Sequence, residues 1–168
     1  STPIDYKTDQ SVRVLQTASK GNGIPVIIMG DGFTQQEIDD EYYADVMDKA
    51  CENLFSEEPI KSLRDYFDVY AVTAVSKSND FTSGNNTIFK CKLAGGGSTA
   101  IEGNDNIVQT YAQCVQNINY NDALVVVILN TEVHAGTTFW YMDSQTGKGI
   151  NFAIAYCPVI KGLESENF

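Results

Sequence analysis

The spacing of apolar residues changes several times along this chain, and each change marks an expected element. An unbroken apolar run, IPVIIMG at 24–30, lies between glycine-containing turns and is typical of a buried strand. Over 35–55, apolar residues recur three and four positions apart with acids between them, which predicts one amphipathic helix. The run YFDVYAVTAVS at 66–76 is rich in β-branched and aromatic residues and predicts a second strand.

The middle of the chain continues this alternation. A short strand is expected within TIFKCKL at 87–93, and the triple glycine at 95–97 predicts a flexible tip. Asn104 or Asp105 can cap a helix that runs to about Ile118, since apolar residues again follow a helical spacing. We therefore expect a second helix before the next strand.

The last apolar runs complete the pattern. DALVVVILN at 122–130 predicts a central strand buried on both faces. GTTFWYM and INFAIAYCP flank the polar stretch DSQTGKG and predict a hairpin. This order of elements predicts an α/β fold with a mixed, mainly parallel sheet that carries helices.

The ends of the chain differ from this regular middle. Residues 1–23 are polar and glycine-rich towards their end, and we expect a lead-in segment there, with one subdomain over 24–168. After Pro158 the sequence PVIKGLESENF resembles the first turn of a helix that Ser165 could cap. The expectation is a chain truncated before that helix.

Composition removes several classes of function. The chain has 22 acidic and 11 basic residues and a net charge of −11, so the cationic surface that nucleic-acid binding requires is not expected. No apolar stretch reaches the roughly 18 residues that a membrane span needs. The first residues, STPIDYKTDQSV, contain no basic leader and no apolar signal core, so we expect any targeting segment to have been removed already.

The turn GDGFTQ at 30–35 raises the question of a ligand site. A phosphate loop needs several glycine amides and usually a lysine, whereas Asp31 would repel a phosphate. Thr34 and Glu37 have the spacing of a capping box, which satisfies two amides at the start of a helix. This favours a structural corner over the alternative, a nucleotide site at this turn.

The remaining chemistry-bearing residues form no complete catalytic set. His134 is the sole histidine, and the acids of EIDDEYYAD are expected on the solvated face of a helix. DSQTGKG lacks the alternating acids and the final glutamate of a calcium-binding EF-hand loop. The cysteines are widely spaced, so a zinc cluster is not predicted, and two disulfides or four buried thiols both remain open; they are Cys51, Cys91, Cys114 and Cys157.

Several stretches together resemble a known family. They are VIIMGDGFTQQE, LFSEEPIKSLRDYFDVYAVTAVS, TIFKCKL, ALVVVILNTEVHAGTT and INFAIAYCP. In this order and at similar spacing, over roughly residues 24–160, they resemble the amino-terminal part of the catalytic domain of the IgA-peptidase family of zinc metallopeptidases.

The resemblance implies a secreted, periplasmic or cell-surface zinc endopeptidase of the zincin type. Zincins carry His-Glu-x-x-His on an active-site helix, where two histidines bind zinc and the glutamate activates a zinc-bound water. No such motif occurs in residues 1–168, so no catalytic residue and no metal ligand is assigned to this chain. Zinc is expected only in the full-length protein.

The resemblance also implies that this chain contributes to substrate binding. Zincins hold an extended substrate against an edge strand, and AGTTFWY at 135–141 is the expected edge here. Gly136 would allow a close approach of the substrate backbone, and Thr137 and Thr138 would present alternate faces. The alternative is an ordinary hairpin strand without a role in binding. The expected partners are a protein or peptide substrate and, through the sheet face that truncation would leave open, a second copy of the chain.

A second hypothesis comes from a different class of function. Since the residues alone contain no catalytic set, the chain could be a non-catalytic secreted module for binding or adhesion. A metal site and peptidase activity in the longer protein would separate the two hypotheses.

Overall fold

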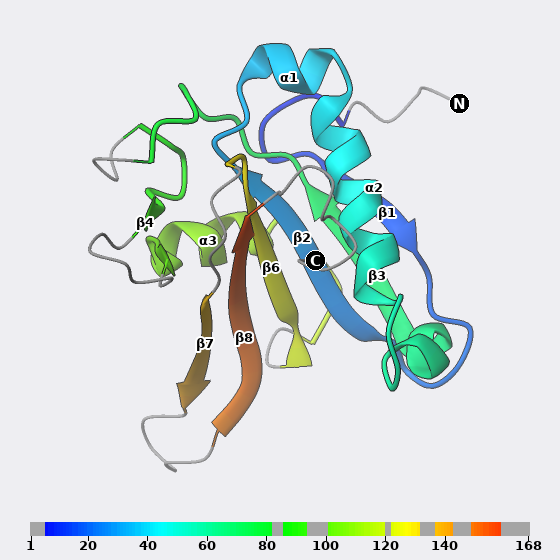
Figure 1. Cartoon of the computed structure of the whole chain (residues 1–168). Helices are drawn as coiled ribbons and strands as arrows, with labels where there is room; N and C mark the ends of the chain where they lie inside the picture. Colours follow the sequence, from blue (N-terminus) through cyan, green and yellow to red (C-terminus); the bar gives the residue numbers. More distant parts are fainter. Residues whose placement is uncertain are drawn as a thin grey trace.

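The apolar runs of the sequence form the strands of one sheet (Figure 1). The computed structural model describes residues 6–81, 86–93, 101–119, 122–131, 137–142 and 149–158, with only the backbone described at 93, 101–102, 137–142, 149–153 and 158. The strands of this sheet are β1 (Val12–Gln16), β2 (Ile24–Asp31), β3 (Phe67–Val72), β6 (Leu124–Leu129), β7 (Thr137–Met142) and β8 (Gly149–Pro158).

The sheet is mixed and mostly parallel, as predicted. Its strand order is β1-β3-β2-β6-β8-β7. Neighbours among β2, β3, β6 and β8 are parallel, whereas β1 and β7 pair antiparallel at the two edges. A separate two-stranded ladder joins β4 (Lys92–Leu93) to β5 (Ile101–Glu102).

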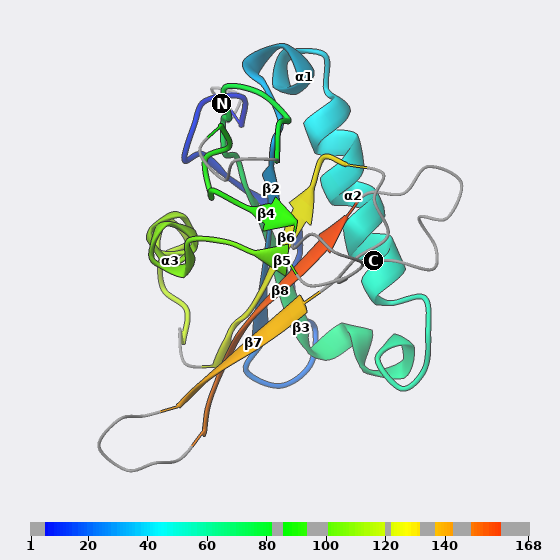
Figure 2. The ribbon, with the colours of Figure 1, turned by 60° about the vertical axis from the view of Figure 1, so that its left-hand side comes forward.

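Helices cover both faces of the sheet, and Figure 2 shows α2 on one side and α3 on the other. The helical elements are α1 (Gln35–Asp39), α2 (Tyr42–Leu54), the 3₁₀ helix η1 (Lys61–Tyr66) and α3 (Asp105–Ala112). Alternate residues of β2 face the two layers, with Val26 and Ile28 in the cluster under α2 and Ile27 and Met29 in the cluster under α3. In the part of the chain that the structure describes, no helix has both the length and the apolar character to cross a bilayer.

The prediction of a single helix over 35–55 is wrong, because the chain breaks it into α1 and α2. Glu41 adopts a left-handed conformation with φ of 66°, between the end of α1 and the start of α2. The break turns the chain around the buried ring of Phe33, which contacts Tyr43 edge-on at 5.1 Å between ring centroids. The packing of Phe33 thus accompanies a change of direction that the helical spacing did not reveal.

Three other elements are shorter than expected, and one of them is the strand predicted over 66–76, which is limited to Phe67–Val72 of β3. Of the strand predicted over 87–93, only Lys92 and Leu93 pair as β4, since several backbone amides of the preceding segment bond to side chains instead. The helix capped by Asn104 ends at Ala112 rather than near Ile118. The flexible tip at 95–97 and the helix turn at Ser165 lie outside the described residues.

The central position predicted for 122–130 is confirmed, although only one face is fully covered. β6 lies between β2 and β8, and its residues that face α3 are buried. On the α2 side, Leu124 and Val126 of β6 and Ala155 and Cys157 of β8 are half-buried. The described helices therefore leave an apolar area over β6 and β8 incompletely covered.

Residues before β2 are tied to the sheet and to its carboxyl end. β1 pairs with β3, and Asp9 accepts hydrogen bonds from the Val75 amide at 2.9 Å and from the Tyr111 hydroxyl at 2.7 Å. Thr73 also donates through its hydroxyl to the carbonyl of Tyr6. These contacts connect the amino-terminal segment to β3 and α3.

Tyr43 connects α2 to the parallel strands β2 and β3 through hydrogen bonds. Its hydroxyl accepts a hydrogen bond from the Gly30 amide at 2.8 Å and donates to the Val72 carbonyl at 2.5 Å. The residue is 4% exposed, and burial raises the pKa of the Tyr43 phenol well above its usual range. One hydroxyl therefore satisfies two backbone groups at the ends of β2 and β3.

Replacing Tyr43 by phenylalanine is expected to lower the free energy of unfolding by about 1–3 kcal/mol, because a buried amide and a buried carbonyl lose their partner. Urea denaturation followed by circular dichroism measures the change. Tyr66→Phe is the matched control, since Tyr66 is 40% exposed and should change stability little.

Tyr43→Phe should also change how the stability of the fold depends on pH. In the unfolded chain Tyr43 ionises near pH 10, but in the folded chain its raised pKa keeps it protonated. Stability is therefore lost as the pH rises above about 10, and Tyr43→Phe should remove part of this loss. An identical alkaline profile in wild type and Tyr43→Phe would contradict the assignment.

Candidate functional site

The turn at the carboxyl end of β2 is built around glycines that have no room for a side chain. A Cβ on Gly30 would lie 2.6 Å from the ring of Phe33 and 2.8 Å from the ring of Tyr43. Gly32 has φ of +82°, and a Cβ there would lie 2.6 Å from the ring of Phe81. The glycines thus serve close packing of aromatic rings against the backbone.

The predicted capping box at the start of α1 is present. The Glu37 amide donates to the Thr34 hydroxyl at 3.4 Å, and the Thr34 amide donates to the Glu37 carboxylate at 3.1 Å. Asn130, directly after β6, donates through its side-chain amide to Glu37 at 2.8 Å and to the Gly32 carbonyl at 3.0 Å. The corner is therefore closed by a residue almost a hundred positions further along the chain.

The Asp31 carboxylate is fully buried and accepts hydrogen bonds from four groups. Oδ1 accepts from the Phe89 amide at 3.0 Å and from the Ser76 hydroxyl at 3.4 Å. Oδ2 accepts from the Thr87 hydroxyl at 2.7 Å and from the Cys91 amide at 3.2 Å. All four donors come from the segment that follows β3, so this carboxylate anchors that segment to β2.

This geometry favours a structural corner at 30–32. Both oxygens of Asp31 are already engaged, and the residue is inaccessible to a phosphate or a metal ion. Asp31 and the turn are recognisable in the sequence. The side-chain partners of Asp31, however, are Ser76 and Thr87, which are ordinary polar residues far away in the chain. No local pattern in the sequence therefore indicates the partners of Asp31.

No metal centre forms within the part of the chain that the structure describes. There, no group of three or more His, Cys, Asp or Glu side chains could hold an ion. All four cysteines are free thiols, which answers the open question about disulfides in this structure. Burial, reinforced by the nearby Asp31, raises the pKa of Cys91, and burial raises that of Cys157 to about 11, so both thiols are poor nucleophiles. His134 lies outside the described residues.

The strand expected to bind substrate lies at an edge of the sheet. β7 pairs only with β8 in the described sheet, and it forms the outer edge visible in Figure 1. Thr137 and Thr138 are its first residues, opposite Tyr156 and Ala155 of β8. Gly136 and the threonine side chains are outside what the structure describes, so their role in binding stays a prediction.

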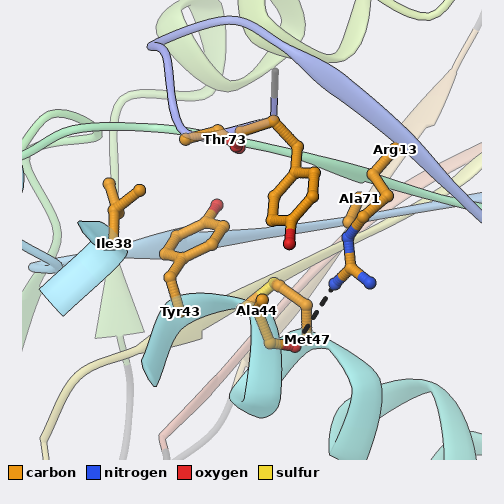
Figure 3. A pocket seen from close by; sticks show the side chains of 8 residues that line it. Arg13, Ile38, Tyr43, Ala44, Met47, Ala71 and Thr73 are labelled. Carbon is orange, nitrogen blue, oxygen red and sulfur yellow. Dashed lines mark hydrogen bonds between the residues drawn. The ribbon is translucent and has the colours of Figure 1, made fainter. Parts of the chain in front are cut away.

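One small cavity lies under the amino-terminal segment, between β3 and α2 (Figure 3). Its volume is about 10 Å³, which holds about one water molecule. Arg13 closes one side, donating to the Ala44 carbonyl at 3.3 Å and pairing with Asp48 at 3.0 Å. This cavity is too small for a substrate group.

Among the described residues, two larger open depressions lie at opposite ends of the parallel strands. One, of about 580 Å³, is at the amino end beside Ile24, Tyr66 and Asp122. The other, of about 310 Å³, is at the carboxyl end and lies against the segment that Asp31 anchors. The second depression has preorganised walls, because its residues Ser76 and Thr87 both bond to Asp31.

The fold and the corner define an α/β domain with a mixed, mostly parallel sheet, in whose described part β7 is an edge strand. Residues 12–146 match the model of the family described as IgA Peptidase M64. Because the match covers most of the 168 residues, the chain belongs to this peptidase family, which confirms the resemblance. A search among curated proteins found no match.

Asp31→Asn tests the role of the buried carboxylate. An amide that replaces one oxygen presents a donor to groups that are themselves donors, so we expect a loss of about 2–4 kcal/mol in the free energy of unfolding. Hydrogen exchange at the Phe89 and Cys91 amides should accelerate, since both donate to this carboxylate.

The matched control is Asp45→Asn, the same chemical change on the exposed side of α2. It should alter stability by about 0.5 kcal/mol or less. Equal effects of the two substitutions, or unchanged exchange at Phe89 in Asp31→Asn, would contradict the anchoring role.

Proposed function

We propose that this chain is the amino-terminal portion of the catalytic domain of a zinc-dependent endopeptidase that cleaves peptide bonds in proteins. The observation that carries the proposal is the family match over residues 12–146. The zinc ligands and the general base would lie beyond this sequence, since residues 1–168 contain no His-Glu-x-x-His. Location in the periplasm, at the cell surface or outside the cell is part of the same proposal.

The residues present do not fit a zinc ion, so no chemical step is assigned to them. The described residues hold no suitable group, and the sequence has a single histidine. The contribution proposed for this chain is structural: a rigid sheet that supports the active-site helix and presents an edge to the substrate.

The half-buried apolar area over β6 and β8 supports the first of these roles. A helix packed on the α2 side of these strands would cover Leu124, Val126 and Cys157. In this proposal the helix that bears the zinc ligands occupies that area. A second copy of the chain is the alternative occupant when the helix is missing.

The outer edge of β7, which pairs with no second strand in the described sheet, supports the second role. An extended peptide can add to the exposed side of an edge strand through main-chain hydrogen bonds, which makes binding largely independent of side chains. Residues Gly136, Thr137 and Thr138 are the proposed contact positions. Side-chain preferences would then come from depressions elsewhere on the domain.

The full-length gene product provides the test of metal dependence. We expect about one zinc per chain by plasma mass spectrometry, as a mononuclear site holds. Casein cleavage should be lost on chelation and restored by zinc. A folded full-length protein that holds no zinc and does not cleave casein would instead support the alternative, a non-catalytic secreted module for binding or adhesion.

Backbone-methylated peptides test strand addition at β7. In an added strand, alternate amides face β7 and the others face away. Of two otherwise identical substrates methylated on complementary sets of alternate amides, one should show a KM raised about tenfold or more, because several hydrogen bonds are lost. The other peptide is the matched control, and equal KM values for the two would contradict binding by strand addition.

A further inference from the structure

We propose that the depression between Lys77 and Lys90 binds a carboxylate, specifically the side chain of a glutamate in a peptide. It has a volume of about 310 Å³ and is lined by Val75, Ser76, Lys77, Asn86, Thr87, Ile88, Lys90 and Ile107. The proposal rests on the proposed peptidase function only for the nature of the ligand, because the binding itself requires no cleavage.

The depression lies where ligands are expected in an open parallel sheet. Its walls follow the carboxyl end of β3 and lie against Asp31 at the carboxyl end of β2, and ligands of such sheets bind outside these ends. Figures 1 and 2 both show this green segment, between β3 and β4, beyond the end of β2 and next to α3. Ile107 of α3 completes the lining.

The walls are held in place before any ligand arrives. Ser76 accepts hydrogen bonds at its hydroxyl from the amides of Gly32, at 3.0 Å, and Ile88, at 2.9 Å, and it donates to Asp31. The Thr87 hydroxyl also donates to Asp31, at 2.7 Å. A wall fixed in this way loses little conformational entropy when it binds a ligand.

The charge of the depression is opposite to that of the whole chain. Lys77 and Lys90 are both exposed, and neither forms a salt bridge with any described residue. No acid is among the described residues that line it, although the chain carries a net charge of −11. Three acids bond directly to lining residues from outside the depression: Asp31 to Ser76 and Thr87, Asp9 to the Val75 amide, and Asp80 to Asn86 at 3.0 Å.

The conformation of Lys90 is a second, independent feature. Its φ of 53° is left-handed, a conformation that favours glycine and asparagine and that residues with long side chains usually avoid. The amide of Lys90 donates to the Thr87 carbonyl at 3.1 Å, which closes a turn at the rim. The turn holds a lysine at a position where glycine would be conformationally easier.

The shape favours glutamate over a compact anion. Val75, Ile88 and Ile107 are half-buried and supply apolar surface to the same depression that Lys77 and Lys90 line. The methylene groups of a glutamate side chain can contact this surface while the carboxylate reaches the lysines. A phosphate ion would interact with the lysine charges but would gain nothing from the apolar surface.

Zero-length cross-linking tests the proposal on the full-length protein. A peptide with blocked ends and one glutamate is activated with a carbodiimide, and tryptic mass spectrometry locates the amide bonds formed with lysines. We expect labelling of Lys77 and Lys90 about fivefold above that of Lys49 and Lys61, the ratio that about 1 kcal/mol of preferential binding gives. Lys49 and Lys61 are suitable internal controls because they are also exposed and form no salt bridge with a described residue.

Variants show whether the two lysines act together. In Lys77→Gln, labelling of Lys90 should fall about threefold or more, because one ammonium then holds the carboxylate alone. Lys61→Gln is the matched control and should leave the labelling of Lys90 unchanged. Both substitutions alter exposed side chains, and circular dichroism checks that the fold is retained.

Three results would overturn the proposal whatever the ligand, and a fourth would overturn a peptide ligand. The first three are uniform labelling of all exposed lysines, labelling of Lys90 that is unaffected by Lys77→Gln, and competition by inorganic phosphate as effective as that by free glutarate. Glutarate that competes as well as the peptide would assign the site to small dicarboxylates and likewise overturn a peptide ligand. The result is independent of the proposed function, since a protein without zinc or peptidase activity can still show selective labelling.

Discussion

The carboxylate of Asp31 lies at the end of a central parallel strand, where water cannot reach it, so the fold must supply its hydrogen-bond donors. The segment after β3 supplies all four: two amides and two hydroxyls. Because the Phe89 and Cys91 amides donate to Asp31, they do not donate to a neighbouring strand. The same interaction closes the corner to ligands and holds the walls of the depression between Lys77 and Lys90.

The described helices cover one face of the sheet more completely than the other. On the α3 side, the core is continuous from β2 to β8, and on the α2 side it thins over β6 and β8. β7 has one side without a strand in the described sheet. In the proposed function, these are the places for a further helix and for an extended substrate.

Most elements follow from local patterns. Apolar runs predicted β2 and β6, the spacing of Thr34 and Glu37 predicted the capping box, and Asn104 was among the expected caps. The errors have a common cause. The break at Glu41 accompanies packing around Phe33, and the loss of strand near Phe89 arises from Asp31, and both are contacts between residues or layers that periodicity does not describe.

By itself, then, the sequence determined the α/β class, the order of most elements and the family resemblance, because these depend on spacing and on short motifs. Only the tertiary structure decided that Asp31 is a buried anchor, that the cysteines are unpaired and that two lysines share one depression. Each of these depends on the distance between residues far apart in the chain. That distance is set when strands pair and side chains pack, and a linear pattern does not contain it.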